Sequence, residues 1–364
     1  MRLSKESFRK MTGARVATVS TLIVLTVVLV VASPTLAASR PKTVAELALY
    51  QGVDRQQILE EGARQEGSLT FYTTGHLRQT VGPLIAAFEK KYPFIKVHVW
   101  RASTTKIVPR VNEEYHAGRY LVDTIETSQI GRMLMVEKGI LQPYFSPNLV
   151  QMDAGTIIKA PGQGVYSAGH YQSFISLGYN TEMISQAEIP KTYHDLLDPK
   201  WKGKMPITNR GAARHWIGII FETLGEEFLV KLSKQKFVLH ALSARGLIDM
   251  IIAGEYAFSP AVFDSHANKS KNVGAPVAWY PIEPVVTYIG QIMLAKNAPH
   301  PYTAMLFIDF DLSKRAGELY KENGYKSPRK DIFVERSYKY TPYPSSTKQY
   351  MKWDDLFDRY FMKK

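Results

Sequence analysis

The stretch Ser68-Leu-Thr-Phe-Tyr-Thr-Thr-Gly-His76 decides the fold of this chain. Its first half predicts a short buried strand, Thr73-Thr-Gly75 predicts a turn, and an apolar stripe at helical spacing continues to about Tyr92. Strand, turn and helix are the repeating unit of an open α/β sheet. In such sheets ligands bind outside the carboxyl ends of the strands, where a helix N-terminus offers free N–H groups. His76 lies at that position and is therefore a candidate ligand-binding residue.

Two further strand–helix units predict one half of a ligand-binding crevice. Residues 95–100 and 121–126 read as strands, and each is followed by a polar turn and a helical pattern. The carboxyl ends of parallel strands meet at one edge of a sheet. We therefore expect Arg101, Thr105 and Ser128, which follow these two strands, to lie near the first turn.

The second half of the chain repeats this logic, although no sequence repeat is visible. Arg210, Arg214 and Arg245 stand at predicted helix starts, and Asp264 follows a predicted strand. Guanidinium groups and helix N-termini both donate to paired oxygen atoms, so the expected ligand is a small anion bearing phosphate, phosphonate or carboxylate. The residues expected to bind it are His76, Arg101, Thr105, Ser128, Arg210, Arg214, Arg245, Asp264 and, as an aromatic wall, Tyr280.

The N-terminal segment predicts export. Five basic residues precede an uncharged, largely apolar run from Val16 to Ser39, and small residues suggest cleavage near Ala37 or Ala38. The run is long enough that an uncleaved anchor is an alternative. The chain contains no cysteine, so packing alone must hold it and no N-terminal cysteine can carry a lipid. We expect a protein of the bacterial periplasm.

The charge of the chain favours anionic partners. Removal of residues 1–38, with five Lys or Arg and one Glu, lowers the formal net charge from +13 to +9. No run of five basic residues occurs, and an exported protein is a poor candidate for nucleic-acid binding. We expect a monomer that binds a small anionic solute.

Length and pattern predict two lobes, because 364 residues can build two separate cores. The expected divisions are a signal peptide at 1–38, a helical segment at 39–67, a first lobe at 68–167 plus 285–325, a second lobe at 168–284, hinge strands near 174–180 and 277–284, and a C-terminal tail at 326–364 that packs on the lobes. Residues 285–295 read as a strand pair back in the first lobe.

Several motifs resemble the ferric-type branch of the bacterial extracellular solute-binding proteins. The resemblance extends from about residue 53 to residue 325. It implies a two-lobed α/β periplasmic binding protein of type 2 that serves an ABC importer, closes over its ligand and delivers it to a permease in the inner membrane. The motifs are the segment from Asp54 to Gly67, Leu197-Asp-Pro-Lys-Trp-Lys-Gly-Lys204, Ile252-Ala-Gly-Glu-Tyr-Ala257, Asn297-Ala-Pro-His-Pro301 and Leu306-Phe-Ile-Asp-Phe310.

The resemblance also implies a second candidate ligand. Members that bind ferric iron use an adjacent tyrosine pair, a histidine after the first strand and a carboxylate after the third. His76 matches the histidine and Glu126 lies near the carboxylate, but Phe263-Asp264 stands in place of the tyrosines. Transported Fe(III) held by His76, Glu126 and Asp264 is therefore the alternative to an anion, and no other cofactor is expected.

A third interpretation, an exported α/β hydrolase or transferase, lacks a motif. The chain contains no Gly-x-Ser-x-Gly elbow, no His-Glu-x-x-His zinc motif, no Gly-x-x-x-x-Gly-Lys phosphate loop and no cysteine nucleophile. We therefore expect a receptor without catalytic activity. A receptor that reports its ligand to a membrane sensor has the same sequence features as one that serves transport.

Overall fold

The computed structural model describes residues 40–332, 339–341 and 346–362. These described residues group as one compact unit. The predicted signal peptide lies outside the described residues. Within the described part of the chain, no helix combines the length and apolar character needed to cross a membrane.

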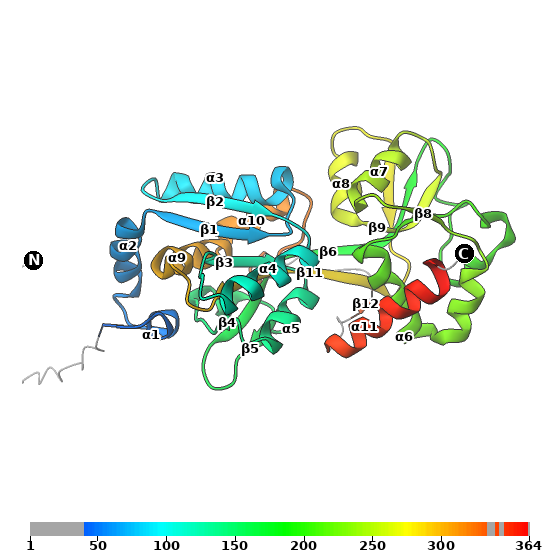
Figure 1. The fold of residues 1–364 in the computed structure, drawn as a ribbon. Helices are drawn as coiled ribbons and strands as arrows, with labels where there is room; N and C mark the ends of the chain where they lie inside the picture. Colours follow the sequence, from blue (N-terminus) through cyan, green and yellow to red (C-terminus); the bar gives the residue numbers. More distant parts are fainter. Residues whose placement is uncertain (1–39, 333–338, 342–345, 363–364) are drawn as a thin grey trace, which may run out of the picture. The chain divides into compact units, whose positions relative to one another are not determined.

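The first lobe is a sheet with helices on both faces (Figure 1). Strands β1 and β2 pair in parallel, with Thr73 opposite Arg101, and β3 pairs in parallel on the other side of β1. The three strands therefore end at one edge of the sheet. The elements are α1 (Val44–Leu49), α2 (Arg55–Glu66), β1 (Ser68–Thr73), α3 (Gly82–Lys91), β2 (Lys96–Arg101), α4 (Thr104–His116), β3 (Thr124–Thr127), α5 (Gln129–Glu137), β4 (Leu141–Gln142), β5 (Ile157–Lys159), α9 (Pro301–Asp311) and α10 (Lys314–Glu322).

Two long antiparallel strands connect the lobes. Strand β6 (Val165–Asn180) and strand β11 (Val285–Ala295) pair from Ala168 to Ile175 of β6. At one end β11 also pairs with β3, and at the other β6 pairs with β9 (Phe258–Phe263) and β10 (Val277–Tyr280). The crossing back into the first lobe thus lies in β11, not in the predicted 277–284 segment, and β11 is one strand where a strand pair was expected.

The second lobe contains a small parallel sheet and the helices around β9. Strand β7 pairs with β8, and the helices after β7, β8 and β9 begin at the carboxyl ends of these strands. The elements are β7 (Pro206–Thr208), α6 (Gly211–Ser233), β8 (Val238–His240), α7 (Ala244–Ile252) and α8 (Asp264–Lys271).

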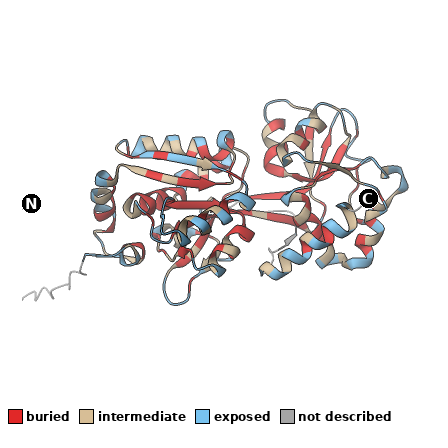
Figure 2. Ribbon diagram, viewed as in Figure 1, coloured by how far each residue is buried: buried red, intermediate tan, exposed pale blue. Residues whose placement is uncertain are grey.

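The hydrophobic core is divided in the same way as the lobes. Two clusters cover the two faces of the first-lobe sheet, one including Phe71 and Phe307 and the other including Ile107 and Met293. Two other clusters fill the second lobe, one around Trp216 and one around Ile248. Buried residues are concentrated on the strands and the inward faces of the helices (Figure 2).

The end of the chain packs on the second lobe. Helix α11 (Thr347–Phe357) lies against α6, and Trp353, Leu356 and Phe357 belong to its core (Figure 1). A short strand, β12 (Tyr340–Thr341), pairs in parallel with the start of β11. Residues of the predicted tail are therefore part of the hydrophobic core and of the main sheet.

Candidate functional site

The turn that follows β1 is organised by a buried carboxylate. Glu126, 1% exposed at the end of β3, accepts hydrogen bonds from Thr73 Oγ1 at 2.5 Å, Thr74 N at 2.9 Å and Gly75 N at 2.8 Å. It also accepts from Thr74 Oγ1 at 3.2 Å and from the phenol of Tyr171 at 3.0 Å. Five donors saturate this carboxylate. Glu126 therefore holds the binding turn, residues 73–75, in its present arrangement.

His76 follows this turn and contacts the second lobe. It precedes a π-helical turn, η1 (Leu77–Val81), and its ring lies edge-to-face on His266 of α8, with 4.8 Å between centroids. Burial lowers the pKa of both imidazoles, and the neighbouring Arg245 lowers it further in each. For His76, Arg101 lowers the pKa as well and Glu126 opposes the shift. The junction of the lobes, where His76 meets His266, therefore combines two neutral imidazole rings with nearby guanidinium groups.

Two helix N-termini of the first lobe converge beside this turn. Ser103 and Ser128 are the N-cap residues of α4 and α5, and neither side chain makes a capping hydrogen bond. Thr104 Oγ1 lies 2.8 Å from Thr127 Oγ1 and 3.2 Å from Ser128 Oγ, so the two helix starts are in direct contact. The N–H groups at these starts and the positive helix ends suit an anion.

Two predicted first-lobe residues are exposed at the same edge. Arg101 ends β2 and its Nε lies 3.5 Å from the carbonyl oxygen of Gly75. Thr105 is exposed, and its hydroxyl lies 2.9 Å from that of Ser103. Arg101 is thus beside the binding turn, whereas Thr105 lies at the start of α4 with its hydroxyl close to its own N-cap.

The predicted arginines of the second lobe lie in different surroundings. Arg245 is close enough to His76 and His266 to lower both their pKa values, while it pairs with Asp249 at 2.7 Å and donates to Ser270 Oγ at 2.9 Å. Arg210 is exposed and donates to the carbonyl of Ala241 at 3.0 Å. Of these two, only Arg245 acts electrostatically on the histidine pair, where it lowers the pKa of both rings.

Arg214 is engaged by the C-terminal helix. It pairs with Asp358 at 2.7 Å and with Asp354 at 3.4 Å, and its guanidinium lies 4.7 Å from the centre of the Phe357 ring. Its charge is thereby matched within the fold, and it attaches α11 to α6.

Asp264 and Tyr280 also make contacts within the protein. Asp264, 1% exposed, accepts from Ser173 Oγ at 2.7 Å, Phe174 N at 2.8 Å and Ser265 N at 2.7 Å. These bonds attach the start of α8 to β6; burial nevertheless raises the pKa of the carboxyl. Tyr280 lies on β10, with Lys191 Nζ 4.9 Å from its ring centre. Among the described residues, no group of three or more His, Asp or Glu side chains has the arrangement of a metal site.

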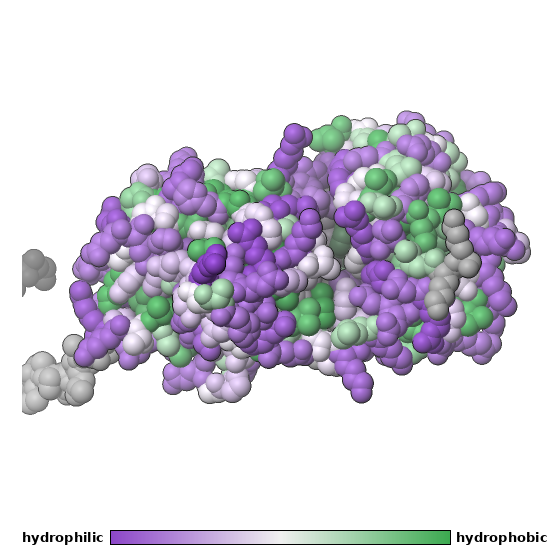
Figure 3. Space-filling view, in the orientation of Figure 1, coloured by the Kyte–Doolittle hydropathy of each residue, from purple (hydrophilic) through white to green (hydrophobic). Residues whose placement is uncertain are grey.

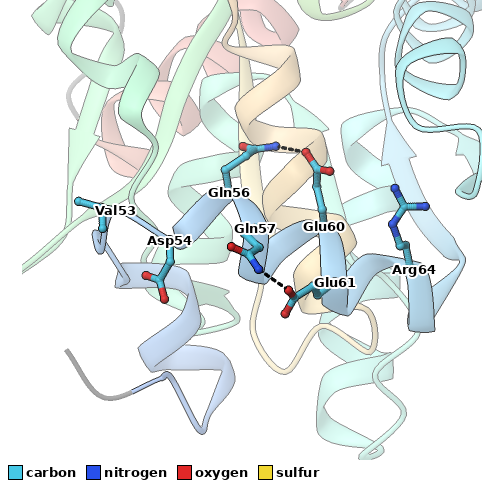
Figure 4. A pocket seen from close by; sticks show the side chains of 7 residues that line it. All are labelled: Val53, Asp54, Gln56, Gln57, Glu60, Glu61 and Arg64. Carbon is cyan, nitrogen blue, oxygen red and sulfur yellow. Dashed lines mark hydrogen bonds between the residues drawn. The ribbon is translucent and has the colours of Figure 1, made fainter. Parts of the chain in front are cut away.

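Two other polar groupings are explained by the fold. His300 lies 3.0 Å from Asp123 and 3.2 Å from Ser68, the geometry of a hydrolase triad. Asp123 also accepts from the backbone of Thr70 and His300, so the grouping ties the start of α9 to β1. An open depression along α2 is lined by side chains that pair with each other, Gln56 with Glu60 and Gln57 with Glu61, each at 2.7 Å (Figure 4).

Sequence reasoning missed His266, Tyr171 and Tyr288. His266 is two residues past Asp264, on the first turn of a helix that follows a strand, and this spacing is the signal that could have found it. The tyrosines lie on the long strands β6 and β11, where the alternating pattern gives no sign of a polar partner.

The molecular surface is hollowed where the two lobes meet (Figure 3).

A buried histidine near the junction makes stability depend on pH. Burial lowers the pKa of His215 to about 4, from an ordinary value of 6.5. As the pH falls, the unfolded chain therefore takes up this proton at a higher pH than the folded chain does. The contribution of neutral His215 to the free energy of unfolding is fully present above about pH 6.5 and is lost as the pH decreases towards 4. Between pH 7 and 4 the wild type should lose on the order of 3 kcal/mol of unfolding free energy that His215→Gln does not lose. Denaturant unfolding at several pH values measures this, with exposed His98→Gln as the control; an unchanged pH slope in His215→Gln would disprove the assignment.

Comparisons with known proteins identify the fold and the family. The sequence pattern described as "Bacterial extracellular solute-binding protein" matches residues 131–359. An uncharacterized protein of Haemophilus influenzae is 27% identical over 206 residues, which are 52% of this chain and only 57% of that relative's length.

Solved structures of periplasmic binding proteins share the fold. The periplasmic binding protein AfuA from Actinobacillus pleuropneumoniae, with fructose-6-phosphate bound, superimposes with a TM-score of 0.70 at 20% identity and covers 82% of this chain and 100% of its own. Iron-bound HitA from Pseudomonas aeruginosa gives a TM-score of 0.67 at 18% identity, covering 80% and 97%. The expected type 2 periplasmic binding protein fold is confirmed. Since the family pattern covers more than half of its residues, this chain belongs to the bacterial extracellular solute-binding proteins.

Proposed function

We propose that this protein is the periplasmic receptor of an ABC importer and captures a small anionic solute, bearing phosphate, phosphonate or carboxylate, between its lobes. The solute stabilises the closed arrangement because it contacts both lobes at once, and an inner-membrane permease then receives it. The receptor acts by binding alone.

The single observation that carries this proposal is the convergence of the α4 and α5 N-termini. Thr104 touches both Thr127 and Ser128, and neither N-cap side chain closes its own helix start. Arg101 of the first lobe and Arg245 of the second add positive charge that lowers the pKa of His76. The solved structure of AfuA with fructose-6-phosphate supports a phosphate-bearing ligand in this fold.

Ferric iron is the second candidate, favoured by the hard oxygen donors near His76. The phenol of Tyr171 and the carboxylate of Glu126 lie 3.0 Å apart, and HitA was solved with iron bound. Glu126 and Asp264, the two predicted carboxylate ligands, already accept several hydrogen bonds each. Titration with a ferric salt tests this candidate: a visible charge-transfer band would support tyrosine coordination, and the absence of both a band and stabilisation would exclude it.

Arg245→Ala tests the anion proposal. Loss of a charged hydrogen bond to an anion typically costs about 1.5–3 kcal/mol, so we expect binding at least about tenfold weaker. Ligand-induced thermal stabilisation by inorganic phosphate, fructose-6-phosphate and citrate measures the effect. Arg359→Ala is the matched control, because Arg359 also pairs with an acidic residue of the second lobe, Glu226. Equal ligand-induced stabilisation of Arg245→Ala and wild type would contradict the proposal.

A further inference from the structure

The contacts of Glu126 extend from the binding turn to the strands that connect the lobes. The phenol of Tyr171 donates a hydrogen bond to Glu126 at 3.0 Å, and the same carboxylate accepts hydrogen bonds from Thr74 N and Gly75 N. Tyr171 is 4% exposed and lies on β6 at the end of its first-lobe segment, four residues before Ile175, which belongs to the second-lobe core. The side chain of Glu126 therefore joins Tyr171 of the connecting strand β6 to the turn that precedes His76.

The position of this phenol is fixed by its neighbours. Tyr171 lies opposite Gly290 of β11, and a Cβ at Gly290 would stand 2.5 Å from Tyr171 Cζ. Only glycine at this position leaves room for the ring to lie across β11. The ring also packs against Tyr325, with 4.9 Å between centroids, and stacks on Tyr288 at 6.5 Å. The hydroxyl is thus held towards Glu126 by packing on several sides.

Aromatic contacts continue from Tyr288 through the second lobe and back to the binding turn. Tyr288 lies 5.5 Å from Phe263, Phe263 lies 5.5 Å from His266, and His266 lies 4.8 Å from His76. The turn is therefore in contact with the connecting strands on one side, through Glu126 and Tyr171, and with the second lobe on the other, through His76. A change in the angle between the lobes must alter at least one of these contacts.

We propose that Tyr171 is a positioning residue that couples the connecting strands to the binding turn through Glu126. When the lobes move, the Tyr171–Glu126 hydrogen bond carries the displacement of β6 to residues 73–75 and so sets the position of the turn that leads to His76. The proposal rests on the proposed function only in treating this turn as part of the ligand site. The hydrogen bonds themselves can be measured without any ligand.

Hydrogen exchange of the full mature chain, comparing Tyr171→Phe with wild type, tests this coupling. Removing the hydroxyl leaves the ring packing intact but removes the bond that fixes the Glu126 carboxylate to β6. The carboxylate can then shift away from the turn, so we expect the amides of Thr74 and Gly75 to exchange at least about tenfold faster. Core amides such as that of Phe71 should keep their wild-type rates. A purely structural role for the hydroxyl would change protection throughout the lobe, not at the turn alone.

Tyr179→Phe is the matched control. Tyr179 lies on the same strand, is also buried, and pairs with the second-lobe strands β9 and β10. Selective loss of protection at Thr74 and Gly75 in Tyr171→Phe, but not in Tyr179→Phe, would support the coupling. Unchanged protection at the turn, a uniform loss across the lobe, or the same change in both variants would overturn it. Failure of the wild type to bind any of inorganic phosphate, fructose-6-phosphate and citrate would count against the proposed function alone.

Discussion

Replacing Glu126 with alanine is expected to lower the free energy of unfolding by about 3–5 kcal/mol and to abolish ligand binding. The carboxylate is 1% exposed and satisfies donors from the turn and from Tyr171. Alanine leaves the hydroxyl groups of Thr73 and Tyr171 without this acceptor, and each unsatisfied buried donor is costly. The N–H groups of Thr74 and Gly75 keep only their second acceptors, the Glu126 carbonyl oxygen and Thr73 Oγ1. The turn that leads to His76 would then lose the interaction that orders it.

Equilibrium denaturation of Glu126→Ala measures this effect, and Glu126→Gln provides the control. Glutamine keeps the size of the side chain and one acceptor oxygen, so its loss of stability should be clearly smaller. If the free energy of unfolding of Glu126→Ala were within about 1 kcal/mol of the wild-type value, Glu126 would not be the acceptor that orders the binding turn.

Replacing Trp353 with alanine is expected to lower the free energy of unfolding by about 3–5 kcal/mol, because large-to-small changes of buried tryptophan create a cavity. Trp353 is 1% exposed and donates its indole N–H to Glu222 at 2.9 Å. It lies so close to α6 that a Cβ on Gly218 would stand 2.0 Å from its ring. The variant should release α11 from α6 and expose the end of the chain to protease.

Met351→Ala is the control for this experiment, since Met351 lies on the same helix and is 62% exposed. Its stability should remain within about 0.5 kcal/mol of the wild type. Denaturant unfolding together with limited proteolysis compares the two variants. Equal stability of Trp353→Ala and Met351→Ala would show that α11 is not an integral part of the second lobe.

The sequence predicts the strand–turn–helix units of the first lobe well, because their patterns are local. The segment from Ser68 to His76 contains the alternation of a strand, the turn residues and the start of the following helical stripe in one short window. Pairing between strands that are far apart in the chain is harder to predict from the sequence. The residues of β11 read as a strand pair, but whether they form one strand depends on their partners in β3 and β6, more than a hundred residues earlier in the chain.

The candidate site is only partly predictable, since residue type does not tell which polar groups the fold already satisfies. Arg214 has the same local pattern as Arg245, yet its partners Asp354 and Asp358 come from a helical segment about 140 residues later. Asp264 has the chemistry of a metal ligand, but its Oδ1 already accepts from Ser173 and Phe174 of β6. Only the folded arrangement shows that Arg101 lies beside the turn that precedes His76 and that Arg245 lowers the pKa of this histidine.

The arrangement of these residues separates two kinds of ligand. The convergent helix starts of α4 and α5 and the two guanidinium groups favour a solute with negative charge. The carboxylates that a bare ferric ion would need are engaged within the protein. The site near His76 and His266 must also accommodate the part of the solute that carries no charge. We therefore expect this part to determine which solute the protein binds.

Native mass spectrometry of the protein released from the periplasm tests the central claim most directly. The proposal predicts one bound small organic or inorganic anion per chain, retained by the wild type and by Arg359→Ala but lost or depleted in Arg245→Ala. A copurifying metal ion without an anion, or a neutral solute bound equally by all three proteins, would contradict it.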